Sequence, residues 1–251
     1  MNDILLSIYI PTYNRVDKVV KQLEFLISEM EDIKDNVEIV VNNNCSTDTT
    51  EKEVLKLIEG TSIKYHRNST NVGIEGNVYK AGGLVHGKYF WLISDDDFLY
   101  SGIIKRVLQI IKTYEDVSYI FLNYSDISAK DKVAYSGPEG LIEDGAALIT
   151  GKCVDQIHVV ILTSSSIYLR EGLTDSIINL PLHSKERYGC TGFASLASLK
   201  KGKSFFESKV WVHNDVGNCS WKDIAYDSNR GMMRMFAKLK LVGYSKKEIS
   251  S

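Results

Sequence analysis

The sequence predicts an α/β protein with a doubly wound, mostly parallel sheet that is flanked by helices. Through the first 125 residues, β-rich runs alternate with runs of helical spacing, and this alternation favours parallel strands joined by right-handed crossovers. Polar clusters also follow three of the predicted strands, at Thr12–Arg15, Asn42–Ser46 and Ser94–Asp97. Because ligands of such sheets bind beyond the carboxyl ends of the strands, these clusters predict one polar site.

The first elements follow from local pattern. The run Leu5–Ile10 predicts a strand that ends at Pro11. Apolar residues then recur at helical spacing and predict an amphipathic helix over residues 15–30. The run Val37–Val41 predicts the second strand.

A second helix and a third strand come next. Asp48 and Glu51 predict the N-cap and the capping partner of a helix that extends to Ile58. The run Ile63–Arg67 predicts a strand, and a helical segment bounded by glycine is predicted at about 74–86. These elements continue the alternation on which the fold class depends.

The fourth predicted strand, Tyr89–Ile93, leads directly into three adjacent carboxylates, Asp95, Asp96 and Asp97. Three like charges repel one another, so a positive partner is expected among them. Hard carboxylate oxygens suit Mg²⁺ or Mn²⁺, ions that commonly share their coordination with substrate phosphates. The alternative is a solvated turn in which Asp97 caps the following helix, although one cap does not require three carboxylates.

Past about residue 126 the pattern loosens into mixed strand candidates with short helices between them. We interpret residues 1–251 as one domain, in which this part builds the second wall of a cleft. The length of 251 residues suits a single large domain.

Composition excludes several classes of protein. Hydrophobic residues make up 44% and charged residues 25%, which is ordinary for a soluble globular chain. The formal charge of −2 provides no basic field for nucleic acid. No apolar run approaches the roughly 20 residues that span a bilayer, and the N-terminal apolar run is interpreted as a strand and not as a signal peptide. The four cysteines form no C-x-x-C pair, which favours reduced thiols in a cytoplasmic protein.

Four segments together resemble the inverting family 2 glycosyltransferases of the GT-A fold. They are PTYNR after the first strand, VVNNNCSTDTT after the second, NVGIEGN, and SDDDFL, and they span roughly residues 5–125 in the order of that family. The pattern is most similar to bacterial enzymes that build surface polysaccharides, including abequosyltransferase-like proteins. The resemblance implies transfer of a sugar from a nucleotide-diphosphate sugar to a saccharide or lipid-linked saccharide acceptor.

The resemblance also implies a division of the chain and a set of site residues. Residues 1–125 would form the nucleotide-sugar-binding half, residues 126–220 the acceptor-side half, and residues 221–251 a basic C-terminal segment. The residues implied for the nucleotide are Pro11, Thr12, Tyr13, Arg15, Asn43, Asp48, Asn71, Gly73, Asp95 and Asp96.

Two departures from the family's pattern bear on the donor. Asn43 stands where the family usually has an Asp that hydrogen-bonds the base, and an amide both donates and accepts. Uracil is therefore in doubt, and cytosine, thymine or guanine become possible. The run of three Asp residues also leaves the register open: Asp95 and Asp97 satisfy D-x-D and are the implied ligands of Mn²⁺ or Mg²⁺, whereas the family's longer form emphasises Asp96 and Asp97.

An inverting enzyme needs a general base for the acceptor hydroxyl. The family places an Asp or Glu at the start of a helix in its second half, and Glu186 is the candidate, with His183 and Asp155 in reserve. The alternative for Glu186 is a surface ion pair with a neighbouring basic residue. His213, at the end of a predicted strand, is a further candidate metal ligand, and its alternative is a structural hydrogen-bond donor.

The segment 230–251 carries basic side chains interleaved with apolar ones and a single acidic residue, Glu248. A basic amphipathic segment can lie on an anionic membrane, which predicts peripheral contact with the inner face of the cell membrane. The alternative is a terminal helix that packs its Met and Phe residues onto the domain.

Three other functions compete with sugar transfer. A sugar nucleotidyltransferase shares the fold, but the first loop, PTYNRV, lacks the glycine- and arginine-rich sequence that would hold a triphosphate. A non-catalytic nucleotide-sugar or carbohydrate-binding module stays open as an alternative. A dinucleotide dehydrogenase is disfavoured because no G-x-G-x-x-G follows the first strand.

Overall fold

The computed structural model of the protein describes residues 4–30, 35–126, 133–146, 162–180, 189–214 and 221–250. The first half alternates strands and helices as predicted: β1 Leu6–Thr12, α1 Val16–Glu29, β2 Val37–Asn43, α2 Thr50–Leu57, β3 Lys64–Arg67, α3 Gly73–Tyr79, α4 Ala81–Leu84 and β4 Tyr89–Leu92. The second half contains β5 Phe98–Leu99, α5 Ile103–Thr113, β6 Val117–Asp126, β7 Gly140–Ile142, η3 Thr163–Ser165, β8 Ser166–Leu169, α7 Arg170–Asn179, α8 Gly189–Leu199, β9 Lys203–Asn214, α9 Trp221–Lys238, η5 Leu239–Val242 and α10 Lys246–Ser250.

The strands of the described chain form one mixed sheet in the order β3-β2-β1-β4-β8-β6-β9-β5, with β7 on the outer side of β9. Strands β1 to β4 pair in parallel, and β6 pairs in parallel with β9. β8 lies antiparallel between β4 and β6. The predicted α/β class with a mostly parallel sheet is therefore confirmed.

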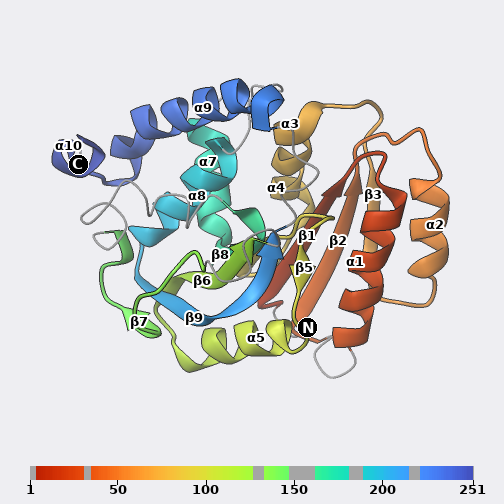
Figure 1. Cartoon of the computed structure of the whole chain (residues 1–251), viewed down its shortest axis with the longest axis horizontal. Helices are drawn as coiled ribbons and strands as arrows, with labels where there is room; N and C mark the ends of the chain where they lie inside the picture. Colours follow the sequence, from red (N-terminus) through yellow and green to blue (C-terminus); the bar gives the residue numbers. More distant parts are fainter. Residues whose placement is uncertain are drawn as a thin grey trace.

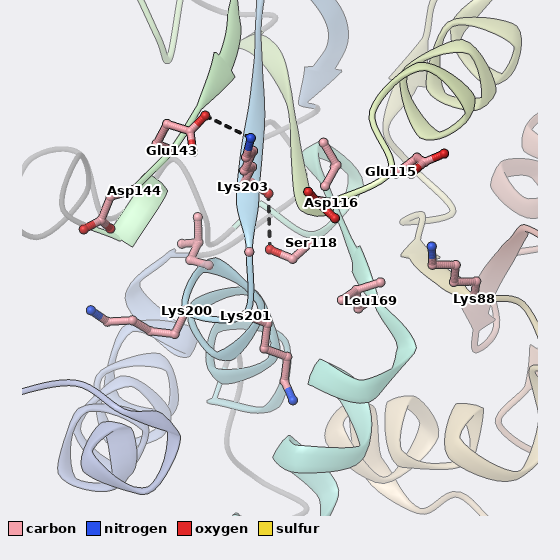
Figure 2. A pocket seen from close by; sticks show the side chains of 13 residues that line it. Lys88, Glu115, Asp116, Ser118, Glu143, Asp144, Leu169, Lys200, Lys201 and Lys203 are labelled. Carbon is pink, nitrogen blue, oxygen red and sulfur yellow. Dashed lines mark hydrogen bonds and ion pairs between the residues drawn. The ribbon is translucent and has the colours of Figure 1, made fainter.

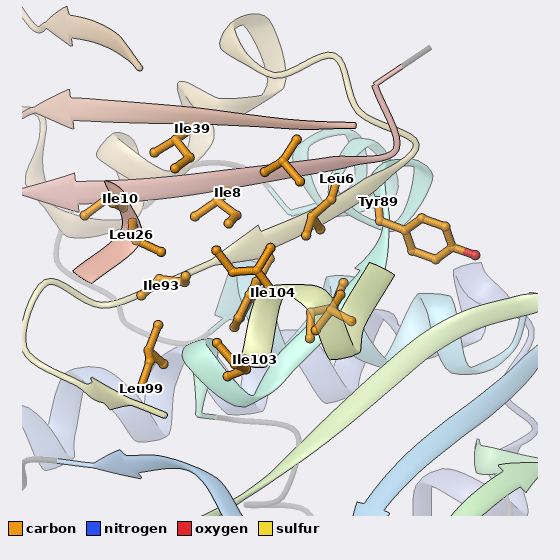
Figure 3. Packing of buried hydrophobic residues seen from close by; sticks show 14 of the residues in the cluster. Leu6, Ile8, Ile10, Leu26, Ile39, Tyr89, Ile93, Leu99, Ile103 and Ile104 are labelled. Carbon is orange, nitrogen blue, oxygen red and sulfur yellow. The ribbon is translucent and has the colours of Figure 1, made fainter. Parts of the chain in front are cut away.

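Helices cover both faces of this sheet (Figure 1). On one face, Leu6, Ile8 and Ile10 of β1 pack with side chains of α1 and α5 (Figure 3). On the other face, Tyr9 packs in a second cluster with side chains of α7, α8 and α9, including Phe193. The two-residue period of a strand accounts for this division of β1 between two cores.

Several local boundaries differ from those predicted. β1 continues through Pro11 because this residue lies past the end of the pairing with β4, where a missing N–H is tolerated, while the pairing with β2 goes on to Thr12. The segment 74–86 divides into α3 and α4. Thr49, not Asp48, is the N-cap of α2, although the Asp48 carboxylate accepts the N–H of Thr50 at 3.0 Å.

The proposed capping role of Asp97 is also corrected. The N-cap of α5 is Gly102, whose φ of 85° lies in the left-handed region that favours glycine. Asp97 therefore stands several residues before the helix and belongs to the loop after β4. The solvated-turn alternative does not hold either, because Asp97 is only 5% exposed.

The C-terminal helices pack on the domain. Met235 and Leu239 are fully buried in the cluster that includes α8, whereas Met233 and Leu241 are exposed. The predicted packing of a terminal helix thus describes the apolar side of α9 and η5. In the part of the chain that the structure describes, no helix is both long enough and apolar enough to cross a membrane.

Candidate active site

The candidate site lies where the carboxyl ends of β1, β2 and β4 meet. β1 pairs in parallel with both neighbours, so the loops after the three strands leave the same edge of the sheet. The N–H of Asn44 donates to the carbonyl of Thr12 at 2.9 Å. The Thr12 hydroxyl in turn donates to Asp95 Oδ2 at 2.8 Å. The fold therefore brings the three polar clusters of the sequence into contact.

Two cationic side chains lie among the carboxylates of the acidic loop, residues Asp95–Asp97. One nitrogen of Arg15, Nη1, is 2.8 Å from Asp95 Oδ1 and 2.8 Å from Asp96 Oδ2. Lys18 Nζ is 3.3 Å from the same oxygen of Asp96. The positive partner expected from the sequence is thus supplied by the protein. Lys18 was not singled out in the sequence, although its spacing of three residues from Arg15 places both near one helix face.

The pKa values of the two carboxylates bonded to Arg15 are shifted in opposite directions. Burial raises the pKa of the Asp95 carboxyl, and the interactions with Arg15 and Thr12 offset that effect only in part. Burial also acts to raise the pKa of Asp96, but the Ser94 hydroxyl and the two cations outweigh it and lower the pKa. Asp96 is therefore the more strongly held anion of the pair.

A group of asparagines, all buried except Asn71, supports the loops next to these carboxylates. We define the asparagine network as Asn42, Asn44, Asn68, Asn71 and Asn77. The Asn42 amide donates to Asn77 Oδ1 at 2.7 Å and to Tyr9 Oη at 2.5 Å. Asn68 donates to Asn77 Oδ1 at 2.8 Å and to Asn44 Oδ1 at 3.0 Å. The network links β1, β2 and α3 through side chains far apart in the sequence.

The network ends on the loop that the resemblance assigned to the nucleotide. Asn44 Nδ2 donates to Asn71 Oδ1 at 2.9 Å, and Asn44 Oδ1 accepts the N–H of Val72 at 3.0 Å. Asn71 Oδ1 also accepts the N–H of Gly73, whose φ is 77°. Asn42 and Asn44 belong to the run NNN in the polar cluster predicted after the second strand, whereas Asn68 and Asn77 were not predicted as site residues.

Asn43 points into the protein. Its side chain is fully buried, donates from Nδ2 to Tyr65 Oη at 2.8 Å and accepts the N–H of Ser46 at 2.8 Å. Between them, Cys45 adopts a φ of 64°, so the amide stabilises a tight turn. Tyr13, by contrast, is 41% exposed beside the first loop. The nucleotide roles of these residues stay predictions.

His213 lies on β9 opposite Phe98 of β5, one residue past the acidic loop. Its Nε2 atom is 2.6 Å from Tyr100 Oη, and its Nδ1 atom is 2.5 Å from Ser125 Oγ. Both ring nitrogens thus have hydrogen-bond partners, as the structural alternative expects. A metal-ligand role, which stays a prediction, would require one of these bonds to break.

The donor set suits a divalent ion only if a substrate completes the coordination. Among the residues the structure describes, no group of three or more His, Cys, Asp or Glu side chains could hold a metal ion. Asp95 and Asp97 nevertheless offer hard oxygen atoms, and Mg²⁺ is commonly bound by one or two carboxylates together with phosphates and water. The residues present therefore fit an ion shared with a diphosphate, in competition with Arg15.

The three candidates for the general base, Asp155, His183 and Glu186, lie outside the described residues. Their role stays a prediction. The described element nearest in sequence to Glu186 is α8, which begins at Gly189. The N–H of Cys190 in its first turn donates to Glu75 Oε1 at 3.2 Å, so a carboxylate of α3 holds the start of this helix.

A cavity of about 690 Å³ lies at the opposite end of the sheet, where β6 and β9 begin (Figure 2). Its lining mixes lysines with carboxylates, and Lys203 Nζ is 3.1 Å from Glu143 Oε1. Lys200 and Lys201 are likewise paired with acidic side chains. The cavity is thus remote from the acidic loop, and its charges largely neutralise one another.

The matches to known proteins agree with one another on the family. A sequence profile described as "Glycosyl transferase family 2" matches residues 7–171. Abequosyltransferase RfbV of Salmonella typhimurium is 36% identical over 114 residues, which cover 45% of this chain and 33% of that protein. An uncharacterized glycosyltransferase of Haemophilus influenzae is 26% identical over 117 residues, which cover 47% of this chain and 38% of that protein. The chain thus matches well under half the length of these curated relatives.

Solved structures share the fold at low sequence identity. The structure of Staphylococcus aureus TarS 1–349 in complex with UDP has a TM-score of 0.71 and 16% identity, and the match covers 98% of this chain and 68% of that one. The mannosyltransferase PcManGT from Pyrobaculum calidifontis, in complex with GDP-Man and Mn²⁺, has a TM-score of 0.67 and 13% identity, with 98% and 67% covered. These likenesses confirm the GT-A fold.

Proposed function

The chain belongs to glycosyl transferase family 2, and from this membership we propose that it transfers a sugar from a nucleotide-diphosphate sugar to a saccharide or lipid-linked saccharide acceptor. We further propose that the transfer inverts the anomeric centre and serves the synthesis of bacterial surface polysaccharide. The observation that carries the proposal is the acidic loop at the end of β4, held against the loop after β1 by Thr12 and Arg15.

The donor nucleotide would lie over the ends of β1 and β2 and the loop 71–73. The asparagine network fixes that loop through Asn44, so the surface proposed for the nucleoside would need little rearrangement when the donor binds. TarS structures contain UDP or UDP-GlcNAc, and PcManGT contains GDP-Man. In this chain Asn43 stands where the family usually has an Asp, which leaves uracil in doubt and makes cytosine, thymine or guanine possible.

The chemistry requires stabilisation of the leaving diphosphate and removal of a proton from the acceptor. A bound Mn²⁺ or Mg²⁺ would be held by Asp95 and Asp97 and would stabilise negative charge on the diphosphate. Arg15 and Lys18 already place positive charge at the same loop. Thr12 orients Asp95 through its hydroxyl, and Glu186 is the proposed base for the acceptor hydroxyl.

A thermal-shift panel tests the donor. UDP-, GDP-, CDP- and dTDP-sugars are added with and without Mn²⁺, since a ligand of the native state raises the unfolding temperature by mass action. We expect the nucleotide sugars of one class to raise the unfolding temperature by several degrees and to be hydrolysed slowly when no acceptor is present. Binding without any hydrolysis would favour the non-catalytic module, and the absence of a shift with every donor would contradict the proposal.

A further inference from the structure

Two exposed rings and one half-buried ring form a cluster that begins one residue past the acidic loop. We define the aromatic cluster as Phe98, Tyr100 and His213. Phe98 is 56% exposed and Tyr100 is 39% exposed, and their rings meet edge to face with centroids 5.6 Å apart. Large exposed aromatic side chains that lie together commonly mark a binding surface, because water solvates them poorly.

We call the loops after β1 and β2, together with the loop 71–73, the nucleotide loops. The position of β5 places the aromatic cluster across the acidic loop from them. In the sheet order, β5 is the last strand and β3 the first. Yet only Ile93–Asp97 separate β4 from β5, and so short a segment extends at most about 20 Å. The acidic loop therefore bridges the two sides. The nucleotide loops are on the side of β1 to β3, and the aromatic cluster is on the side of β5 and β9.

The rings are held in place before any ligand binds. Leu99 is buried in the cluster with α5, so the alternation of a strand turns Phe98 and Tyr100 to the other face. Tyr100 Oη bonds His213 Nε2, and His213 Nδ1 bonds Ser125 Oγ. The imidazole centroid lies 5.2 Å from that of Tyr100 and 6.3 Å from that of Phe98. Little side-chain freedom remains to be lost on binding at Tyr100 and His213.

We propose that the aromatic cluster is the subsite for the acceptor sugar, an assignment that rests on the proposed function. The Phe98 ring stacks on the apolar C–H face of a pyranose, and the hydroxyl of Tyr100 bonds a sugar hydroxyl. A transferase must hold its second substrate beside the diphosphate of the first. The acidic loop has the nucleotide surface on one side and this cluster on the other, which satisfies that requirement.

Ligand-observed NMR with methyl glycosides of glucose, galactose, mannose and N-acetylglucosamine tests the subsite. Wild type, Phe98→Ala, Phe98→Tyr and Met233→Ala are compared. Met233 is 73% exposed on α9 and is the matched control for loss of an exposed apolar side chain. We expect at least one glycoside to bind wild type, about tenfold weaker binding by Phe98→Ala, and normal binding by Phe98→Tyr and the control.

The thermal shift with the nucleotide sugar is measured on the same variants and is expected to persist in Phe98→Ala. Loss of that shift would place the nucleotide, not the acceptor, on the cluster and would overturn the assignment. Equal glycoside binding by wild type and Phe98→Ala, or no binding by wild type, would overturn it too. Glycoside binding that depends on Phe98, in a protein that binds no nucleotide sugar, would instead retain the subsite and contradict the proposed transfer reaction.

Discussion

Helix α8 and four members of the asparagine network (Asn42, Asn44, Asn68 and Asn77) are buried, but they are stabilised in different ways. In the network, Asn42, Asn44 and Asn77 each bond named partners on other elements. In α8, every residue of Gly189–Leu199 is buried, and its apolar side chains, such as Phe193 and Leu196, pack in the second hydrophobic cluster. The hydroxyls of Thr191, Ser195 and Ser198 have no hydrogen-bond partner among the residues the structure describes.

The two regions therefore contribute differently: hydrogen bonds fix the geometry of the loops, whereas apolar packing mainly adds to the stability of the fold. A hydrogen bond holds its partners at one distance and one angle, and a buried amide that loses its partner carries a desolvation cost. Apolar packing depends mainly on volume and tolerates exchange of similar residues. The loops that face the proposed donor are thus held by directional bonds, whereas α8 supports the second face of the sheet by packing. Each of the following predictions tests one side of this comparison.

The acidic loop, which stands on the network's side, should give the largest effect. Asp95→Asn and Asp97→Ala should each lower transfer by roughly 1000-fold, about 4 kcal/mol in the barrier, because charge stabilisation at the leaving group is lost. Far-UV circular dichroism should stay native. The Mn²⁺-dependent thermal shift should vanish, and wild-type nucleotide binding that is as tight in EDTA as with Mn²⁺ would contradict the metal role.

Glu38 tests directional bonding at the amino end of the same strands. Burial acts to raise the pKa of its carboxyl, but hydrogen bonds from Lys64, Ser7 and the N–H of His86 outweigh it and lower the pKa from 4.5 to about 2. The carboxyl is therefore more acidic in the folded state, so its stabilisation is complete above pH 4.5 and is lost as the pH falls toward 2.

Urea unfolding of wild type between pH 5 and pH 2 should show this loss as roughly 3 kcal/mol at most. Glu38→Gln should be less stable at pH 7 and should show a smaller decline with acid. An identical pH dependence in the two proteins would assign the decline to other carboxylates.

A matched pair of alanine substitutions compares the two buried regions directly. Asn77→Ala leaves bonding groups of Asn42 and Asn68 without their partner and should lower the free energy of unfolding by about 2 kcal/mol. It should also weaken donor binding. Ser195→Ala removes a hydroxyl without a described partner and should change stability by about 0.5 kcal/mol or less. Equal losses in the two variants would remove the distinction between the regions.

Variants of Arg15 test whether the guanidinium competes with a metal ion for the carboxylates of the acidic loop. Without donor, Arg15→Ala should bind Mn²⁺ about tenfold more tightly, since the guanidinium no longer occupies Asp95 and Asp96. Electron paramagnetic resonance of free Mn²⁺ measures this affinity without any turnover. The Mn²⁺ affinity of Arg15→Lys should lie between those of wild type and Arg15→Ala. An unchanged affinity in Arg15→Ala would show that Mn²⁺ and the guanidinium do not compete for these oxygens.

The smallest effect is expected on the outer side of the C-terminal helices. Because Met235 and Leu239 are buried, deleting the tail would disturb the domain, and reversing charge is the cleaner change. The triple change Lys240→Glu, Lys246→Glu and Lys247→Glu should reduce sedimentation with anionic vesicles at low salt, by about 1 kcal/mol for each residue that contacts the surface. Binding that responds neither to salt nor to these changes would exclude an electrostatic anchor.

The sequence by itself determined the alternation of strands and helices, the acidic loop and the polar loops at the strand ends. These features depend on periodicity and on residue type, which are local properties of the chain. The run into Asp95–Asp97 also predicted a positive partner without naming it. Strand ends could be placed only approximately, as Pro11 shows, because pairing with β2 carries β1 onward to Thr12.

Only the tertiary structure decided which side chains meet. Arg15 bonds Asp95 across 80 residues of sequence, and Asn42 bonds Asn77 across 35. Asn43 turns inward, and β5 pairs with β9 so that His213 bonds Tyr100. No local pattern specifies such contacts, because they depend on sheet order and crossover geometry, which bring distant segments together only when the whole chain packs.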